Sequence, residues 1–318
     1  MRRWSDPVEI MFGGRSVPNA YRGIALDDDL VPASPCRMAR MRIYGLDFTS
    51  APSRRKPLIA VGCILKGRIL RVESAEVLAD FEEFEDFLEN GGPWVCGMDF
   101  PFGQPRPLVE ALGWPTSWED YVRKVSRLSK EEFEGAIKGH MAGRPKGGKY
   151  HYRLADRRSG SSSAMRLFRV PVGKMFYKGA PRLLSSGVSV EPCRPTKSGR
   201  VAVEAYPAVV ARRFLGRRSY KNDERSKQTP EQRVAREELV TGLESTSLEE
   251  AYGFVVEMDG GWREELAKDP MADTLDSVLC AVQAAWAYMK RDEGWGVPEE
   301  CDRDEGWILD PKLLAEED

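Results

Sequence analysis

Four aspartates in this sequence stand where a carboxylate is costly to bury. Asp47 ends the apolar run IYGLDF, and Asp99 ends a second apolar run, WVCGMDF. Asp273 and Asp276 open the long apolar segment DTLDSVLCAVQAAWAYMKR. A charge in such surroundings is unfavourable unless a partner offsets it. Each aspartate alone has an ordinary explanation as a loop or helix cap, so it is their combination that points to one shared site.

Several carboxylates gathered at one point need cations to offset their repulsion. Oxygen-only ligands select Mg²⁺ or Mn²⁺ over softer metals. Two such ions about 4 Å apart can activate a water and stabilise the leaving oxygen of a phosphodiester. We therefore expect Asp47, Asp99, Asp273 and Asp276 to bind Mg²⁺ or Mn²⁺. Glu204, within the run VAVEAY, is a further catalytic candidate, although it could instead point to solvent from a half-exposed strand.

The elements before residue 101 predict a mixed sheet. The short connections between the first three apolar runs indicate antiparallel strands, and a helix then leads to a parallel fourth strand. The predicted strands are residues 43–48, 57–65, 68–76 and 94–100, and the helix is 78–90. The fifth predicted strand is 201–207, followed by helical patterns at 208–218, 229–243, 247–258 and 273–291.

The last of these helices is expected to carry two of the acids to the sheet. Asp273 and Asp276 are three residues apart, so they share one helical face. Small residues on that helix, such as Ala281 and Ala284, would let it lie close to the strands. Its first turn would then meet the ends of the strands that carry Asp47 and Asp99.

Residues 101–200 differ from the rest of the chain because a basic stretch at 144–182 is interleaved with aromatic residues. Basic side chains neutralise phosphates and aromatic rings stack on bases, so we expect a nucleic-acid partner, DNA or RNA. A solvated surface loop is the alternative. The expected contacts are Arg153, Arg157, Arg158, Arg166 and Lys174.

Composition limits the class of protein. The 318 residues have a formal net charge of −2, which by itself favours neither nucleic acid nor a membrane surface. The six cysteines form no CxxC pair, which argues against a zinc ribbon, a redox dithiol or a disulfide framework. The N-terminus lacks an apolar signal region and no run is long enough to span a bilayer, so a cytoplasmic protein without a membrane partner is expected.

The expected organisation is one domain with extensions. Residues 41–291 would form the domain, with 101–200 inserted as a basic subdomain. Residues 1–40 show no clear period and predict a poorly ordered extension, whereas the acid-rich residues 292–318 predict a solvated tail.

Four motifs together resemble a known family. GLDFTSAP, GMDFPFGQP, VEAYPA and ADTLDSVLCAVQAAW resemble the predicted nuclease family catalogued as domain of unknown function 429, over roughly residues 41–291. The order of elements resembles the ribonuclease H-like fold. The resemblance implies an α/β, mixed five-stranded sheet flanked by helices. It also implies that Asp47, Asp99 and Glu204 are the acids of the first, fourth and fifth strands and that Asp276 is the helix acid. Ala272 stands where relatives often carry histidine.

A metal-dependent nuclease or phosphodiesterase is the leading hypothesis from these residues. Thr49 and Ser50, directly after Asp47, would also suit an actin- or sugar-kinase-like ATPase, but a second Gly-rich phosphate loop is not found. A non-catalytic nucleic-acid-binding module is the third possibility, because the basic clusters alone would suffice for binding.

Overall fold

The protein is described by a computed structural model that covers residues 11–12, 15–16, 40–222 and 224–314. The chain divides into two compact units, residues 1–37 and 38–318. In the first, strand β1 (Met11–Phe12) pairs antiparallel with β2 (Arg15–Ser16). The rest of the expected extension at 1–40 lies outside the described residues, except Arg40, which begins β3.

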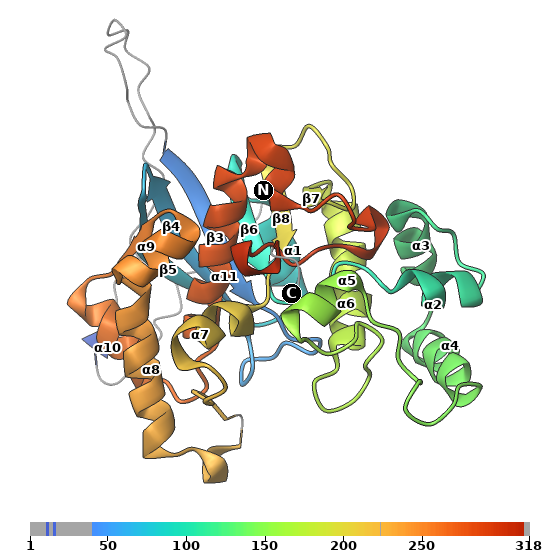
Figure 1. Cartoon of the computed structure of the whole chain (residues 1–318), viewed down its shortest axis with the longest axis horizontal. Helices are drawn as coiled ribbons and strands as arrows, with labels where there is room; N and C mark the ends of the chain where they lie inside the picture. The colour runs from blue at the N-terminus through green and yellow to red at the C-terminus, as the bar shows by residue number, and fades with distance from the viewer. Residues whose placement is uncertain (1–10, 13–14, 17–39, 223, 315–318) are drawn as a thin grey trace, which may run out of the picture. The chain divides into compact units, whose positions relative to one another are not determined.

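One mixed sheet of seven strands organises the second unit (Figure 1). Its spatial order is β7-β8-β6-β3-β4-β5-β9. β4 runs antiparallel to both of its neighbours, β3 and β5. β6, β8 and β7 continue the sheet from β3 in parallel, and β9 is parallel to β5. The strands are β3 (Arg40–Asp47), β4 (Leu58–Lys66), β5 (Ile69–Leu78), β6 (Trp94–Met98), β7 (Ser189–Glu191), β8 (Arg200–Glu204) and β9 (Val255–Glu257).

The helices lie between and after these strands. The first part of the chain contributes α1 (Phe81–Glu89), α2 (Arg106–Ala111), α3 (Trp118–Val125), α4 (Lys130–Ala142), α5 (Leu154–Ser159) and α6 (Val172–Ser186). The later part contributes α7 (Pro207–Leu215), α8 (Pro230–Leu243), α9 (Thr246–Tyr252), α10 (Gly260–Lys268) and α11 (Asp273–Met289). Short 3₁₀ turns are η1 (Arg225–Lys227), η2 (Arg291–Gly296), η3 (Arg303–Glu305) and η4 (Pro311–Leu313).

The predicted α/β class with a mixed sheet is confirmed, including the antiparallel first three strands and the helical crossover to a parallel fourth. The strand number of five is wrong, because the sheet has seven. The two missed strands, β7 and β9, have three residues each, too few for a period-2 pattern. β9 falls in the segment 247–258 that was predicted to be helical. Gly253, at φ 85°, ends helix α9 there, so the chain leaves the helix and joins the sheet edge.

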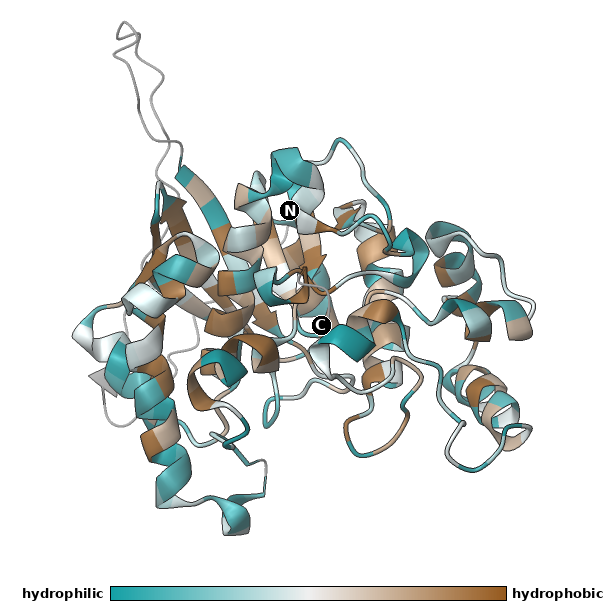
Figure 2. Ribbon diagram, in the orientation of Figure 1, coloured by the Kyte–Doolittle hydropathy of each residue, from teal (hydrophilic) through white to brown (hydrophobic). Residues whose placement is uncertain are grey.

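Helices cover both faces of the sheet. On one face α11 packs over the central strands together with α5, α7, α8, α9 and α10, and on the other lie α1, α2, α3, α4 and α6. The strands are largely hydrophobic whereas the outer helix α8 is mostly hydrophilic (Figure 2). The segment 101–200 therefore shares the core of the sheet, through buried side chains such as Trp118, Phe133 and Phe176.

Two glycines set how close α11 lies to the sheet. Gly45 of β3 and Gly97 of β6 are directly opposite each other in the parallel register. A Cβ on Gly45 would overlap the backbone of α11 at Ser277 and Ala281, and one on Gly97 would overlap the Cys280 carbonyl. The absence of side chains at these two positions is what lets α11 approach the strands.

The same strands place their acids beneath that helix. Side chains two residues apart in a strand share a face, so Asp47 lies on the face of Gly45 and Asp99 on the face of Gly97. Because α11 rests on the two glycines, its first turn, with Asp273 and Asp276, is held next to both strand ends. The pattern Gly-x-Asp, present in both GLD and GMD, thus positions the helix and the acid together.

The expected solvated tail needs correction. Within residues 292–314, Trp307, Ile308 and Leu309 are buried. Ile308 forms a parallel bridge with Glu204 beside β8, and Leu309 N–H donates to the Glu204 carbonyl at 3.0 Å. The acids of this segment lie around an apolar run that completes the core, and Asp310, fully buried, accepts hydrogen bonds from Tyr252 and Gln283.

Candidate acidic metal site

Asp47, Asp99, Asp273 and Asp276 are brought together at one end of α11, as their positions in the sequence predict. The pKa of Asp47 reflects this proximity most directly, because the three other aspartates all affect it. Burial raises the pKa of Asp47 well above its ordinary value, and the charges of Asp276, Asp273 and Asp99 raise it further, whereas Lys221 lowers it. The carboxylates of Asp276, Asp273 and Asp99 thus all lie close enough to act on Asp47. We call these four residues the acidic cluster.

The first turn of α11 is tied to strand β3 by a serine. Ser277 Oγ accepts from the Asp47 backbone N–H at 3.2 Å and is within 2.8 Å of the Ile59 carbonyl, to which it donates. The residue before the helix, Ala272, is buried and adopts a left-handed conformation at φ 59°. Such a conformation strains a residue with a Cβ and is stable only where the surroundings impose it. The start of the helix is therefore fixed against the strand that carries Asp47.

Asp276 is the most buried acid of the cluster, with 1% of its surface exposed. Tyr220 OH donates to its Oδ1 at 2.5 Å, and the Lys221 ammonium makes a close ion pair with its Oδ2. The neighbouring acids raise the pKa of Lys221, so its ammonium remains charged. Both partners come from the loop between α7 and α8. Lys221 therefore supplies positive charge to the acidic cluster.

Tyr206 extends the site from the N-terminal end of α7. Burial raises the pKa of its hydroxyl, and the charges of Asp99 and Asp276 raise it further. The sequence did not identify Tyr206, Tyr220 or Lys221 as residues of this site, and it gave no hydrogen-bonding role to Ser277. The run VEAYP gave a local signal for Tyr206, since a residue preceding proline at a strand end commonly begins a turn or helix.

Two further acids of the cluster also have raised pKa values. Burial, with the charge of Asp276, raises the pKa of Asp99 to about 7, although part of its side chain stays exposed. Burial likewise raises the pKa of Asp273 to about 6, and the charge of Lys221 opposes the rise. These carboxyls bind protons more readily in the folded chain than in the unfolded chain. Their ionisation therefore opposes folding as the pH rises.

Because ionisation of Asp99 opposes folding, we expect replacement of Asp99 by Asn to change the stability of the protein in a pH-dependent way. Without metal, the wild-type free energy of unfolding falls as the pH rises from about 4 to about 7, because the folded state must release a proton that the unfolded state has already lost. At pH 8 we expect Asp99→Asn to be more stable than the wild type by about 2 kcal/mol, a value discounted for partial exposure. Near pH 4.5 most of that gain should disappear.

Urea unfolding in EDTA at the two pH values measures the gain. Asp86→Asn, at an exposed position of α1, is the control and should leave stability unchanged at both. An Asp99→Asn variant no more stable than the wild type at pH 8 would show that Asp99 carries no unfavourable charge there.

Glu204 belongs to a neighbouring ion pair rather than to the acidic cluster, although its charge helps to raise the pKa of Asp99 and both residues line one small pocket. Glu204 is aligned with Met98 in the β8–β6 register, one residue after the position of Gly97. Successive residues of a strand face opposite sides of the sheet, so Glu204 faces the side away from α11. There its carboxylate accepts from Arg153 through both oxygens, at 2.8 and 2.7 Å, and from Phe102 N–H at 2.9 Å. A carboxylate with all these partners is a structural anchor that fixes the segment after β6 rather than a free ligand.

The predicted nucleic-acid contacts divide into two groups. Arg153 is 2% exposed and is held by Asp156 and Glu204, so its guanidinium is not a free surface group for phosphate. A guanidinium needs such pairing to be buried. Arg158 and Lys174 are partly exposed and paired with Glu300 and Glu134, respectively. Arg157 is exposed, and the Arg166 guanidinium lies 5.6 Å from the ring centre of Phe168.

The donors of the acidic cluster fit a hard divalent cation in chemistry, because all are carboxylate oxygens. Within the described part of the chain, however, no group of three or more His, Cys, Asp or Glu side chains is arranged to hold a metal ion. In this structure the ammonium of Lys221 is the cation that offsets the charge of Asp276. The residues that would hold a cation are Asp47, Asp99 and Asp276, with Asp273 beside them.

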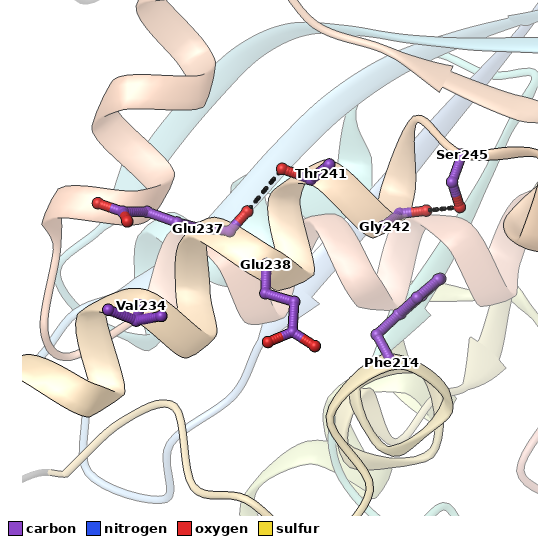
Figure 3. Close-up of a pocket in the computed structure, with 7 residues that line it drawn as sticks. All are labelled: Phe214, Val234, Glu237, Glu238, Thr241, Gly242 and Ser245. Atoms are coloured by element: carbon purple, nitrogen blue, oxygen red, sulfur yellow. Dashed lines mark hydrogen bonds between the residues drawn. The ribbon is translucent and has the colours of Figure 1, made fainter.

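A surface pocket between two helices, away from the acidic cluster, has no part in this site. It has a volume of about 470 Å³ and lies between α7 and α8, with Phe214 and Val234 among its lining residues (Figure 3). Thr241 and Ser245 at its edge donate to carbonyls within their own segment, at 2.9 and 2.6 Å. None of its lining residues belongs to the acidic cluster, and its polar groups do not converge on one point.

Comparison with known proteins assigns the family. The chain belongs to the family described as "Protein of unknown function (DUF429)", which it matches over residues 45–302. The match includes every residue of the acidic cluster. Neither a curated protein nor a solved structure gives a significant match. Among the described residues, no helix has both the length and the apolar character needed to cross a membrane.

Proposed function

We propose that this chain is a metal-dependent phosphodiesterase that cleaves nucleic acid, on a ribonuclease H-like domain. The observation that supports the proposal most is the convergence of Asp47, Asp99, Asp273 and Asp276 from two parallel strands and one helix. The support for the fold assignment is the run of three antiparallel strands followed by parallel strands on the β3 side.

Asp47, Asp99 and Asp276 would hold Mg²⁺ or Mn²⁺, with Asp273 assisting. The cation, when bound, would activate water and stabilise the leaving oxygen of the phosphodiester. Ser277 and Tyr220 orient Asp47 and Asp276 through the hydrogen bonds described above. No protein nucleophile is required by this scheme.

Cleavage assays with the full chain test the proposal. Labelled single-stranded and duplex DNA and RNA are incubated with Mg²⁺ or Mn²⁺, and EDTA serves as the control. We expect at least one substrate to be cut only when metal is present. Failure to cut any of them would contradict the proposal, and salt-dependent binding without cleavage would favour a non-catalytic binding module.

The ion pair between Lys221 and Asp276 leads to a separate prediction about metal affinity. The Lys221 ammonium and a divalent cation would both be attracted to Asp276, so each weakens the binding of the other. We therefore expect Lys221→Met to bind Mn²⁺ roughly tenfold more tightly than the wild type. Metal-free Lys221→Met should also be less stable, because Asp276 would lose its cationic partner.

Calorimetric titration with Mn²⁺ measures this affinity without any need for turnover. Lys227→Met is the matched control, since Lys227 lies in the same loop and is 61% exposed in its pair with Glu224. Equal or weaker Mn²⁺ binding by Lys221→Met would show that Lys221 does not compete for the site.

A further inference from the structure

A small pocket opens beside the acidic cluster, with Asp99 in its lining. Its volume is about 140 Å³. Apolar walls come from Val170, Val172 and Met175, among others. Polar groups come from Ser161, Ser162 and Tyr206, and the charged groups besides Asp99 are Arg153 and Glu204, which form an ion pair with each other. The pocket joins the end of β6 to the segment between α5 and α6. A group bound in it would lie next to the proposed site of phosphodiester cleavage.

The size and walls of this pocket restrict what it can hold. An apolar cavity of about 150 Å³ is large enough for one benzene ring. One six-membered ring therefore matches the volume here, whereas a fused two-ring system would project out of it. The hydroxyls of Ser161 and Tyr206 could contact the polar edge of such a ring while the valines and Met175 cover its faces.

The segment that forms the pocket is also unusually apolar at its surface. Phe168 and Val170 are 56% and 57% exposed and rank among the most exposed large hydrophobic side chains of the described chain. Arg166 lies over the Phe168 ring at 5.6 Å. Exposed aromatic rings and guanidinium planes are the surfaces on which unpaired bases stack. Arg169, between Phe168 and Val170, has a left-handed φ of 62°.

We propose that this pocket binds one unpaired pyrimidine base next to the scissile phosphate, and that Phe168 stacks on a neighbouring base. A paired base cannot enter, so the substrate class is single-stranded DNA or RNA, or a strand with an extruded nucleotide. The proposal rests on the proposed function only for the position of the phosphate beside Asp99. Binding of the base itself requires no catalysis.

Fluorescence anisotropy in EDTA tests the pocket independently of cleavage. The probes are labelled dT8, dA8, a GC-rich hairpin as the duplex and the RNA U8, and comparison of dT8 with U8 distinguishes the sugars. We expect dT8 or U8 to bind at least fivefold more tightly than dA8 and than the duplex. Equal affinity for dA8, or for the duplex, would overturn the proposal whether or not the protein cuts nucleic acid.

Matched variants locate the binding. Val170→Asn changes an exposed wall residue, and Val234→Asn changes a valine of equal exposure, 57%, on α8. Val170→Asn should weaken binding of dT8 about fivefold to tenfold, and Phe168→Ala should weaken it similarly. Val234→Asn should have no effect. Because Val170 and Phe168 are exposed, folding should survive their replacement, and wild-type affinity in both variants would overturn the proposal.

Discussion

Replacement of Asp47 by Asn is expected to reduce metal-dependent cleavage by on the order of a thousandfold or more. Loss of one carboxylate ligand removes several kcal/mol of charge stabilisation in the transition state, and each 1.4 kcal/mol is a factor of about ten in rate. Burial raises the pKa of Asp47, and the charges of Asp276, Asp273 and Asp99 raise it further, so ionisation of Asp47 is unfavourable in the folded protein. The variant should therefore fold at least as stably as the wild type, so the loss would not reflect unfolding.

The measurement is the initial rate of cleavage at saturating Mn²⁺, together with a urea unfolding curve for each protein. Asp86→Asn, an exposed carboxylate on α1, is the control and should keep the wild-type rate. An Asp47→Asn variant that cleaves at the wild-type rate would remove Asp47 from the catalytic site.

Gly45→Ala is expected to destabilise the folded protein by about 3 kcal/mol or more, or to prevent folding. The added Cβ would overlap backbone atoms of Ser277 and Ala281, which no side-chain rotation can relieve. To make room, α11 would have to move away from β3. That movement would also separate Asp276 from Asp47, so the variant should bind Mn²⁺ more weakly even where it remains folded.

Gly139→Ala is the matched control for this substitution. Gly139 is exposed on α4, and a Cβ there meets no atom within 4 Å. Because alanine is the better helix former, this variant should be more stable by about 0.5–1 kcal/mol. Urea unfolding of both proteins gives the comparison. Equal stability of Gly45→Ala and the wild type would mean that α11 does not rest on Gly45 as described.

The central part of the fold could be predicted from the sequence because its signals are local. β3, β4, β5 and β6 are apolar runs bounded by turn residues, and α11 begins with acids. The short edge strands could not be predicted, since three residues carry no period. The packing of residues 292–314 was also missed. Its net acidity concealed the apolar run at Trp307–Leu309, whose burial depends on the distant strand β8.

The acidic cluster could be predicted because residues two apart in a strand face the same side of the sheet, and this spacing can be read from the sequence. Asp47 and Asp99 each follow a glycine by two residues, so they share the face on which the helix lies. The same argument excludes Glu204, which aligns with Met98 rather than Asp99. The contact of Lys221 with Asp276 had no local signal, since 55 residues separate them and a loop presents the lysine.

Binding of Mn²⁺ to the metal-free protein at pH 8 tests the shared carboxylate site most directly. A calorimetric titration should show saturable binding by the wild type and by Asp86→Asn, and binding at least tenfold weaker by Asp47→Asn and by Asp276→Asn. Loss from both variants would place acids from the sheet and from α11 in one site. Equal Mn²⁺ binding by the wild type and these two variants, or no binding by the wild type, would contradict the account.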